Sequence, residues 1–132
     1  KIKKYLQRSF PISHRQIVYI LNISAPTSLK SLPVDYGYSK NILYFEFFNR
    51  KTIIQFINGK SIQTNYPLKY WIEIAKNVPF AQPHKSFLVN LNYISALQKN
   101  DIIMLNDDLI PLSRHFKRNF LEEYKENLHE VI

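Results

Sequence analysis

The stretch NILYFEFFNRKTIIQFINGKSIQT, residues 41–64, decides the fold. Two runs in it are rich in Ile, Phe and Thr, namely Ile42–Phe47 and Thr52–Ile57. Such β-branched and aromatic runs are typical of strands, and the four residues Phe48–Lys51 between them are short enough to form a hairpin connection. The stretch therefore predicts two antiparallel neighbours.

A second turn follows the second run. The pair Asn58-Gly59 favours a type I′ hairpin turn, because both central residues of that turn need positive φ. It leads into a third run, Lys60–Thr64. Together the three runs predict a three-stranded meander.

A short helix is expected next. Between Tyr66 and Asn77 the apolar residues change to helical spacing, Pro67 suits the first turn, and Pro79 closes the segment.

More β hairpins are expected beyond this helix. The predicted strands are Phe87–Asn90, Tyr93–Gln98, Ile102–Leu105 and Leu109–Leu112. Two groups of turn residues, Lys99-Asn100-Asp101 and Asn106-Asp107-Asp108, separate the last three strands.

An amphipathic helix is expected from Arg114 to about Leu128. Aromatic and aliphatic residues recur there at a spacing of four, at Phe116, Phe120, Tyr124 and Leu128, and Ser113 is a possible N-cap.

The N-terminal part divides differently. Lys1–Arg15 is basic and interrupted by a proline, which indicates a linker, whereas Gln16–Ile23 is a strand candidate and Leu29–Tyr38 an edge-strand candidate. We expect residues 1–30 to be a linker with a first strand and residues 31–132 to be the main domain.

Composition fits one β-rich globular domain. The chain has 132 residues, 45% of them hydrophobic, and only two glycines. Cysteine is absent, which excludes disulfides and thiolate chemistry and is consistent with a cytoplasmic location. No apolar run reaches the length of a membrane span, so we expect no membrane partner.

Charge points to an anionic partner. The formal net charge is +8, and residues 1–40 hold seven basic groups against one acidic group. The basic character stops near Arg118, since from Glu122 onward there are four acidic groups and one basic group.

The final helix carries these charges against its own dipole. Its first turns hold Arg114, His115, Lys117 and Arg118, and its later turns hold Glu122, Glu123, Glu126 and Glu130. Each such placement costs the helix a few tenths of a kcal/mol, so helix stability does not explain it, whereas a bound phosphate would. The alternative is a solvated face with ion pairs such as Arg118 with Glu122.

Two other loops are basic. In His84-Lys85-Ser86 the lysine is the expected contact, and the histidine is expected to order the turn through its ring nitrogens. Arg50-Lys51 lies between two predicted strands and matters only if it shares a side of the molecule with the other basic groups. Four scattered histidines and no Gly-rich phosphate loop indicate no enzyme, metal or cofactor.

One set of residues stands in a specific order and spacing: Phe80, His84-Lys85-Ser86-Phe87-Leu88-Val89-Asn90, Ile94, Ile110-Pro111-Leu112-Ser113-Arg114 and Lys117. With this pattern the segment Phe80–Arg114 resembles the LytTR domain of bacterial response regulators, and the resemblance extends over about residues 31–125. It implies a mainly β fold of elongated antiparallel sheets, with one short helix and a C-terminal helix.

The resemblance also implies a function. Family members bind duplex DNA at promoters through loop side chains that enter successive major grooves, and matching positions point to Lys85, Arg114 and either Arg50 or Lys51. Lys85 and His115 depart from residues common in the family. We therefore expect a two-component transcription regulator, bound as two copies on promoter repeats, with a receiver domain upstream.

Two other functions stay open. One is non-specific binding of RNA or single-stranded nucleic acid through exposed aromatic residues and the same basic loops. The other is a protein-interaction or anionic-surface domain.

Overall fold

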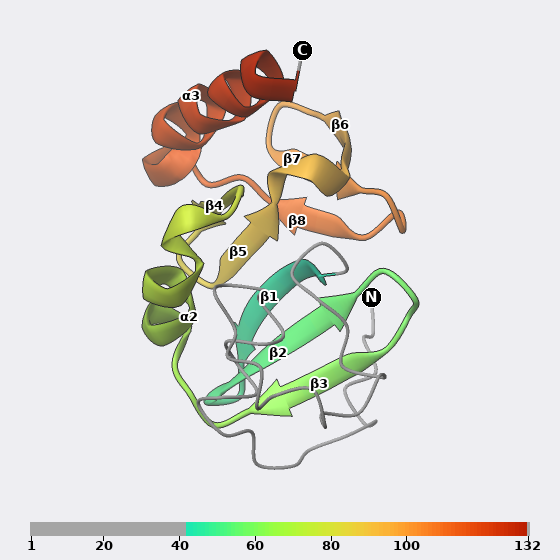
Figure 1. Cartoon of the computed structure of the whole chain (residues 1–132), viewed down its shortest axis with the longest axis vertical. Coiled ribbons are helices and arrows are strands. Elements are labelled where there is room, and N and C mark those ends of the chain that lie inside the picture. Colours follow the sequence, from blue (N-terminus) through green and yellow to red (C-terminus); the bar gives the residue numbers. More distant parts are fainter. Residues whose placement is uncertain (1–41, 132) are drawn as a thin grey trace, which may run out of the picture.

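The structure, a computed structural model, describes residues 42–131, so the strands predicted at Gln16–Ile23 and Leu29–Tyr38 lie outside the described residues. The elements are β1 (Ile42–Phe48), β2 (Lys51–Phe56), β3 (Ser61–Thr64), α2 (Leu68–Ile74), the 3-10 turn η4 (Ala75–Asn77), β4 (Phe80–His84), β5 (Phe87–Asn90), the 3-10 turn η5 (Leu91–Tyr93), β6 (Ile94–Leu97), β7 (Asp101–Met104), β8 (Leu109–Pro111) and α3 (Arg114–Val131) (Figure 1).

The strands form two antiparallel sheets. The larger has five strands in the order β3-β2-β1-β5-β4, and the smaller has the order β6-β7-β8. Figure 1 shows β1, β2 and β3 toward one end of the long axis, α3 toward the other and α2 along one side. The predicted meander and the mainly β class with two helices are confirmed. Among residues 42–131, neither helix combines the length and the hydropathy of a membrane-spanning segment.

Two hydrophobic clusters hold the elements together. In the first, Trp71 of α2 is fully buried against the meander, and its ring packs at a tilt against that of Phe45, with centroids 5.1 Å apart. In the second, Phe120 of α3 is buried with Ile102, Met104 and other residues of both sheets. Of the residues predicted on one face of the final helix, Phe120 is core, Phe116 and Tyr124 are half-buried, and Leu128 is exposed, because only the middle of α3 packs its inward face closely against the sheets.

The two hairpin turns of the meander differ from the prediction. Asn49 and Arg50 have φ values of 54° and 65°, so the type I′ turn is the one between β1 and β2. Between β2 and β3, Gly59 has φ 92° and Asn58 is not in the positive region. There the Phe56 N–H donates to Lys60 O at 2.9 Å, which closes a three-residue loop. The type I′ prediction at Asn58-Gly59 was wrong. The pairing of Gln55 with Ser61 and the bond between Phe56 and Lys60 leave a three-residue loop, whereas a type I′ hairpin turn has two residues.

Strand β4 was not predicted. Pro83 interrupts its sequence pattern, and the register of β4 against β5 is irregular between Ala81 and His84. A proline cannot donate to a ladder, but β4 is an edge strand, where a missing donor is tolerated.

The two helices also differ in detail. α2 begins at Leu68 with Pro67 as its N-cap, and its last residues form η4 instead of an α-helical turn. α3 begins at Arg114 as predicted, but the Ser113 hydroxyl is buried with no hydrogen-bond partner among the described residues. The predicted side-chain cap is therefore not formed, and Ser113 contributes its carbonyl, which accepts from the Phe116 N–H at 3.1 Å.

Candidate nucleic-acid interface

Two basic hairpin turns lie side by side at one end of the five-stranded sheet. β1 ends and β5 begins there, and the Phe47 N–H donates to Ser86 O at 2.8 Å. The Asn49–Arg50 turn therefore adjoins the turn that contains Lys85. Neighbouring strands are about 4.8 Å apart, so the centres of these two turns, two strands apart in the sheet, are separated by roughly 10 Å.

The start of α3 extends this row. The Ser113 N–H donates to Pro83 O at 2.9 Å, so Arg114 begins its helix beside the end of β4. All three predicted basic elements thus occupy the same end of the sheet, in the order β1–β2 turn, β4–β5 turn and α3 N-terminus. The sequence analysis required the basic groups to share one side of the molecule, and only the structure could test this.

The cations at this end are available to solvent. Arg50, Lys85 and Arg114 are exposed, and within residues 42–131 none of them pairs with a carboxylate. His115 is exposed too, and its ring lies edge-on to Phe116 with centroids 5.3 Å apart. Unpaired exposed cations need no ion pair to be broken before they meet an anion.

His84 has the structural role that was expected. Its Nδ1 accepts a hydrogen bond from the Ser86 N–H at 3.0 Å, and its ring packs edge-on against Phe87. The imidazole therefore holds the turn in shape while the exposed Lys85 side chain projects from it.

The structure separates Arg50 from Lys51. The Lys51 ammonium donates to Asn65 Oδ1 at 2.9 Å, and this exposed hydrogen bond links the start of β2 to the residue that follows β3. Arg50 is exposed in the turn itself. Of the two residues left open by the sequence, Arg50 is the better placed for an external ligand.

The other two cations in the first turns of α3 have partners. The Lys117 ammonium donates to the Lys99 carbonyl at 2.7 Å. Arg118 and Glu122 approach to 3.9 Å, but their side chains are 90% and 65% exposed, and such a pair is worth little. The alternative explanation for these charges was a solvated helix face with ion pairs. It applies in part to Arg118, which approaches Glu122, and it does not apply to Arg114.

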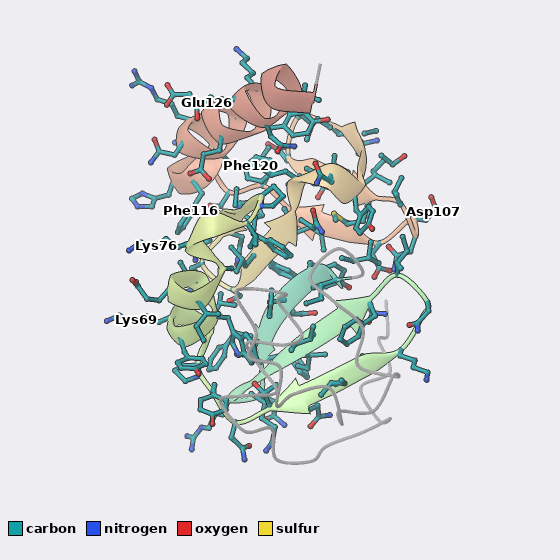
Figure 2. The ribbon with its side chains drawn as sticks, viewed as in Figure 1. Lys69, Lys76, Asp107, Phe116, Phe120 and Glu126 are labelled. Atoms are coloured by element: carbon teal, nitrogen blue, oxygen red, sulfur yellow. The ribbon has the colours of Figure 1, made fainter. Side chains whose placement is uncertain are left out.

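α3 connects the basic end to an acidic one. Its 18 residues span roughly 27 Å, and near its far end Asn127 donates to Asn92 Oδ1 at 2.9 Å, beside η5. Glu126 lies there on the outer surface (Figure 2).

Burial raises the pKa of Glu123, and the neighbouring Glu126 carboxylate raises it further. The basic residues in the first turns of α3 therefore lie at the same end of the sheet as the two basic turns, and Glu123 and Glu126 lie toward the other end.

Two comparisons with known proteins gave a match. The family described as the LytTR DNA-binding domain matches residues 38–125. The chain belongs to the LytTR DNA-binding domain family. A solved structure described as the LytTR DNA-binding domain of a methyl-accepting/DNA response regulator from Bacillus cereus has the same fold, with a TM-score of 0.58 at 22% identity, covering 64% of this chain and 81% of that one. A search of curated proteins gave no match.

Sequence reasoning did not single out Lys69, one of several further basic residues of this LytTR domain. Lys69 is exposed on α2, and it was treated only as part of a predicted helix. The available signal was the spacing of Lys69, Glu73 and Lys76, which is that of one helix face.

Proposed function

We propose that this LytTR domain binds duplex DNA in a sequence-specific manner, as the effector domain of a transcription regulator. Arg114 and Lys85 enter the major groove and contact base edges, and Arg50, Lys117 and Arg118 contact phosphates. The observation that carries the proposal is the pair of backbone hydrogen bonds, Phe47 to Ser86 and Ser113 to Pro83, that brings the three basic elements to one end of the sheet.

Electrostatics supports one docking orientation. Exposed cations gather at the basic end, where α3 begins, and the carboxylates of Glu123 and Glu126 lie toward the other end of α3. A phosphate backbone is attracted by the first end and repelled by the second. A phosphate bound at the start of α3 offsets the cost of placing these charges against the helix dipole.

The wider assembly is proposed by analogy with the family. The proposed boundary between residues 1–30 and a DNA-binding domain of residues 31–132 lies outside the described residues, and a receiver domain precedes both in a two-component regulator in the cytoplasm. Two copies bind the repeats of one promoter.

The salt dependence of binding tests the number of phosphate contacts. With the contacts of Arg50, Lys117 and Arg118, the logarithm of the binding constant should fall against the logarithm of salt concentration with a slope of roughly −2.7 for one domain on a single-site duplex. Fluorescence anisotropy on a duplex obtained by random-site selection measures it. A slope near zero would contradict phosphate contact.

One observation favours a second candidate, which is binding of single strands. Phe47 and Phe48 are 38% and 53% exposed beside the Arg50 turn, and exposed rings can stack on bases. Competition decides between the two candidates. If a single-stranded oligonucleotide displaces the selected duplex at equal concentration, the duplex proposal is wrong.

Replacing Arg50 with Gly should raise stability and weaken binding together. An L-residue pays roughly 1–2 kcal/mol for the left-handed conformation that Arg50 adopts, and glycine does not. Because glycine also has more freedom in the unfolded chain, we expect a gain of up to about 1 kcal/mol in urea denaturation. The salt slope, which is the slope of the logarithm of the binding constant against the logarithm of salt concentration, should become shallower by about 0.9.

Asn49→Gly is the matched control for this variant. Asn tolerates the left-handed region better than Arg, so the gain in stability should be smaller, and the salt slope should stay unchanged. Equal binding by Arg50→Gly and the parent chain would show that Arg50 does not contact the nucleic acid.

A further inference from the structure

We propose that Lys69, at the start of α2, is an additional phosphate contact of the same interface. This inference rests on the proposed function, since it assigns a fourth element to the DNA-binding end. The element is the segment from the end of β3 into the first turn of α2.

The strand register places this segment at the basic end. Thr64 of β3 pairs with Thr52 of β2, one residue into the strand that follows the Asn49–Arg50 turn. The bond from the Lys51 ammonium to Asn65 Oδ1, at 2.9 Å, links the same two strand ends. α2 begins three residues after Asn65, so Lys69 follows directly from this end of the sheet.

The start of α2 is held firmly. The Thr52 hydroxyl donates to the Tyr66 carbonyl at 2.7 Å, and the Trp71 indole N–H donates to Thr64 Oγ1 at 3.2 Å. Trp71 itself is fully buried. The backbone of Lys69 thus has a fixed position relative to Arg50, which reduces the entropy lost when its side chain meets a phosphate.

Charge pairing on α2 leaves Lys69 available. The exposed face of the helix and its 3-10 extension consists of Lys69, Glu73 and Lys76, and the Lys76 ammonium lies 3.0 Å from the Glu73 carboxylate. A glutamate paired with a lysine toward the C-terminus has the better orientation for a helix, which favours this pair over Lys69 with Glu73.

Within the part of the chain that the structure describes, Lys69 has no ion-pair partner. Figure 2 shows Lys69 and Lys76 pointing outward on the side of the molecule where Phe116, in the first turn of α3, is also seen. The unpaired positive charge of α2 therefore lies at Lys69.

The test compares Lys69→Gln with Lys60→Gln in the full chain. Lys60 follows the loop between β2 and β3, at the opposite end of the same meander, and is also exposed. Binding to a selected duplex and to a random duplex is measured by anisotropy across a range of salt concentrations. Urea denaturation of each variant shows that both remain folded.

We expect Lys69→Gln to make the salt slope shallower by about 0.9 and to weaken binding about fivefold at 0.15 M salt. The selected and random duplexes should be affected equally, because a phosphate contact carries no sequence information. Lys60→Gln should leave both quantities unchanged.

The inference is overturned if Lys69→Gln keeps the parent slope while Arg114→Ala still weakens the selected duplex, and in that case the proposed function stands. It is also overturned if Lys60→Gln changes the slope as much as Lys69→Gln, since the effect would then be one of net charge. A parent chain that does not bind duplex DNA overturns the proposed function itself.

Discussion

Arg114→Ala should weaken binding to the selected duplex by roughly 5- to 150-fold, which corresponds to about 1–3 kcal/mol. It should weaken binding to random duplex much less. Arg114 is exposed at the first position of α3 and has no ion-pair partner in residues 42–131, so its removal leaves the fold intact. Its planar fork of donors can bond two acceptors of a guanine at once, and alanine removes both bonds.

Two further variants separate base reading from charge. Arg114→Lys keeps the charge and loses the planar fork, so the salt slope should persist while discrimination falls. Arg118→Ala, one turn along the same helix, should lower affinity for both duplexes equally. If Arg114→Ala weakens selected and random duplexes by the same factor, Arg114 does not read a base.

Phe120→Ala should lower the free energy of unfolding by roughly 3–5 kcal/mol. The ring is 1% exposed and lies in the cluster that joins α3 to both sheets. Small domains have only about 5–15 kcal/mol of stability in total, so this is a large share. Urea denaturation followed by circular dichroism measures the change.

Phe116→Ala is the matched control on the same helix. Phe116 is half-buried and lies outside the buried cluster, so its truncation should cost less than about 2 kcal/mol. Equal losses from the two variants would mean that α3 does not pack through Phe120.

Local patterns were sufficient for most elements. The β-branched and aromatic runs of residues 42–64 predicted the meander, and the spacing of Trp71 and Phe120 with their neighbours predicted two helices. These patterns succeed because a strand or helix buries one side, and that side is visible as periodicity in the chain. The same reasoning missed β4, because a proline in an edge strand looks like an interruption.

The candidate site could be predicted only in parts. Each basic group was visible by itself, and the family resemblance marked Lys85 and Arg114, but the choice between Arg50 and Lys51 stayed open. The structure distinguishes them through the bond from Lys51 to Asn65, residues 14 positions apart in the chain. Lys69 was overlooked because its significance depends on which end of the sheet α2 begins at.

The amino-acid sequence by itself determined the β-rich class, the two helices and the presence of basic groups in three separate segments. Periodicity and composition are local, so they need no knowledge of the tertiary fold. Only the tertiary structure decided that these segments share one end of the molecule and that the acidic end of α3 lies away from them. Hydrogen bonds such as Phe47 to Ser86 and Ser113 to Pro83 join residues far apart in the chain, and no local pattern specifies such pairings.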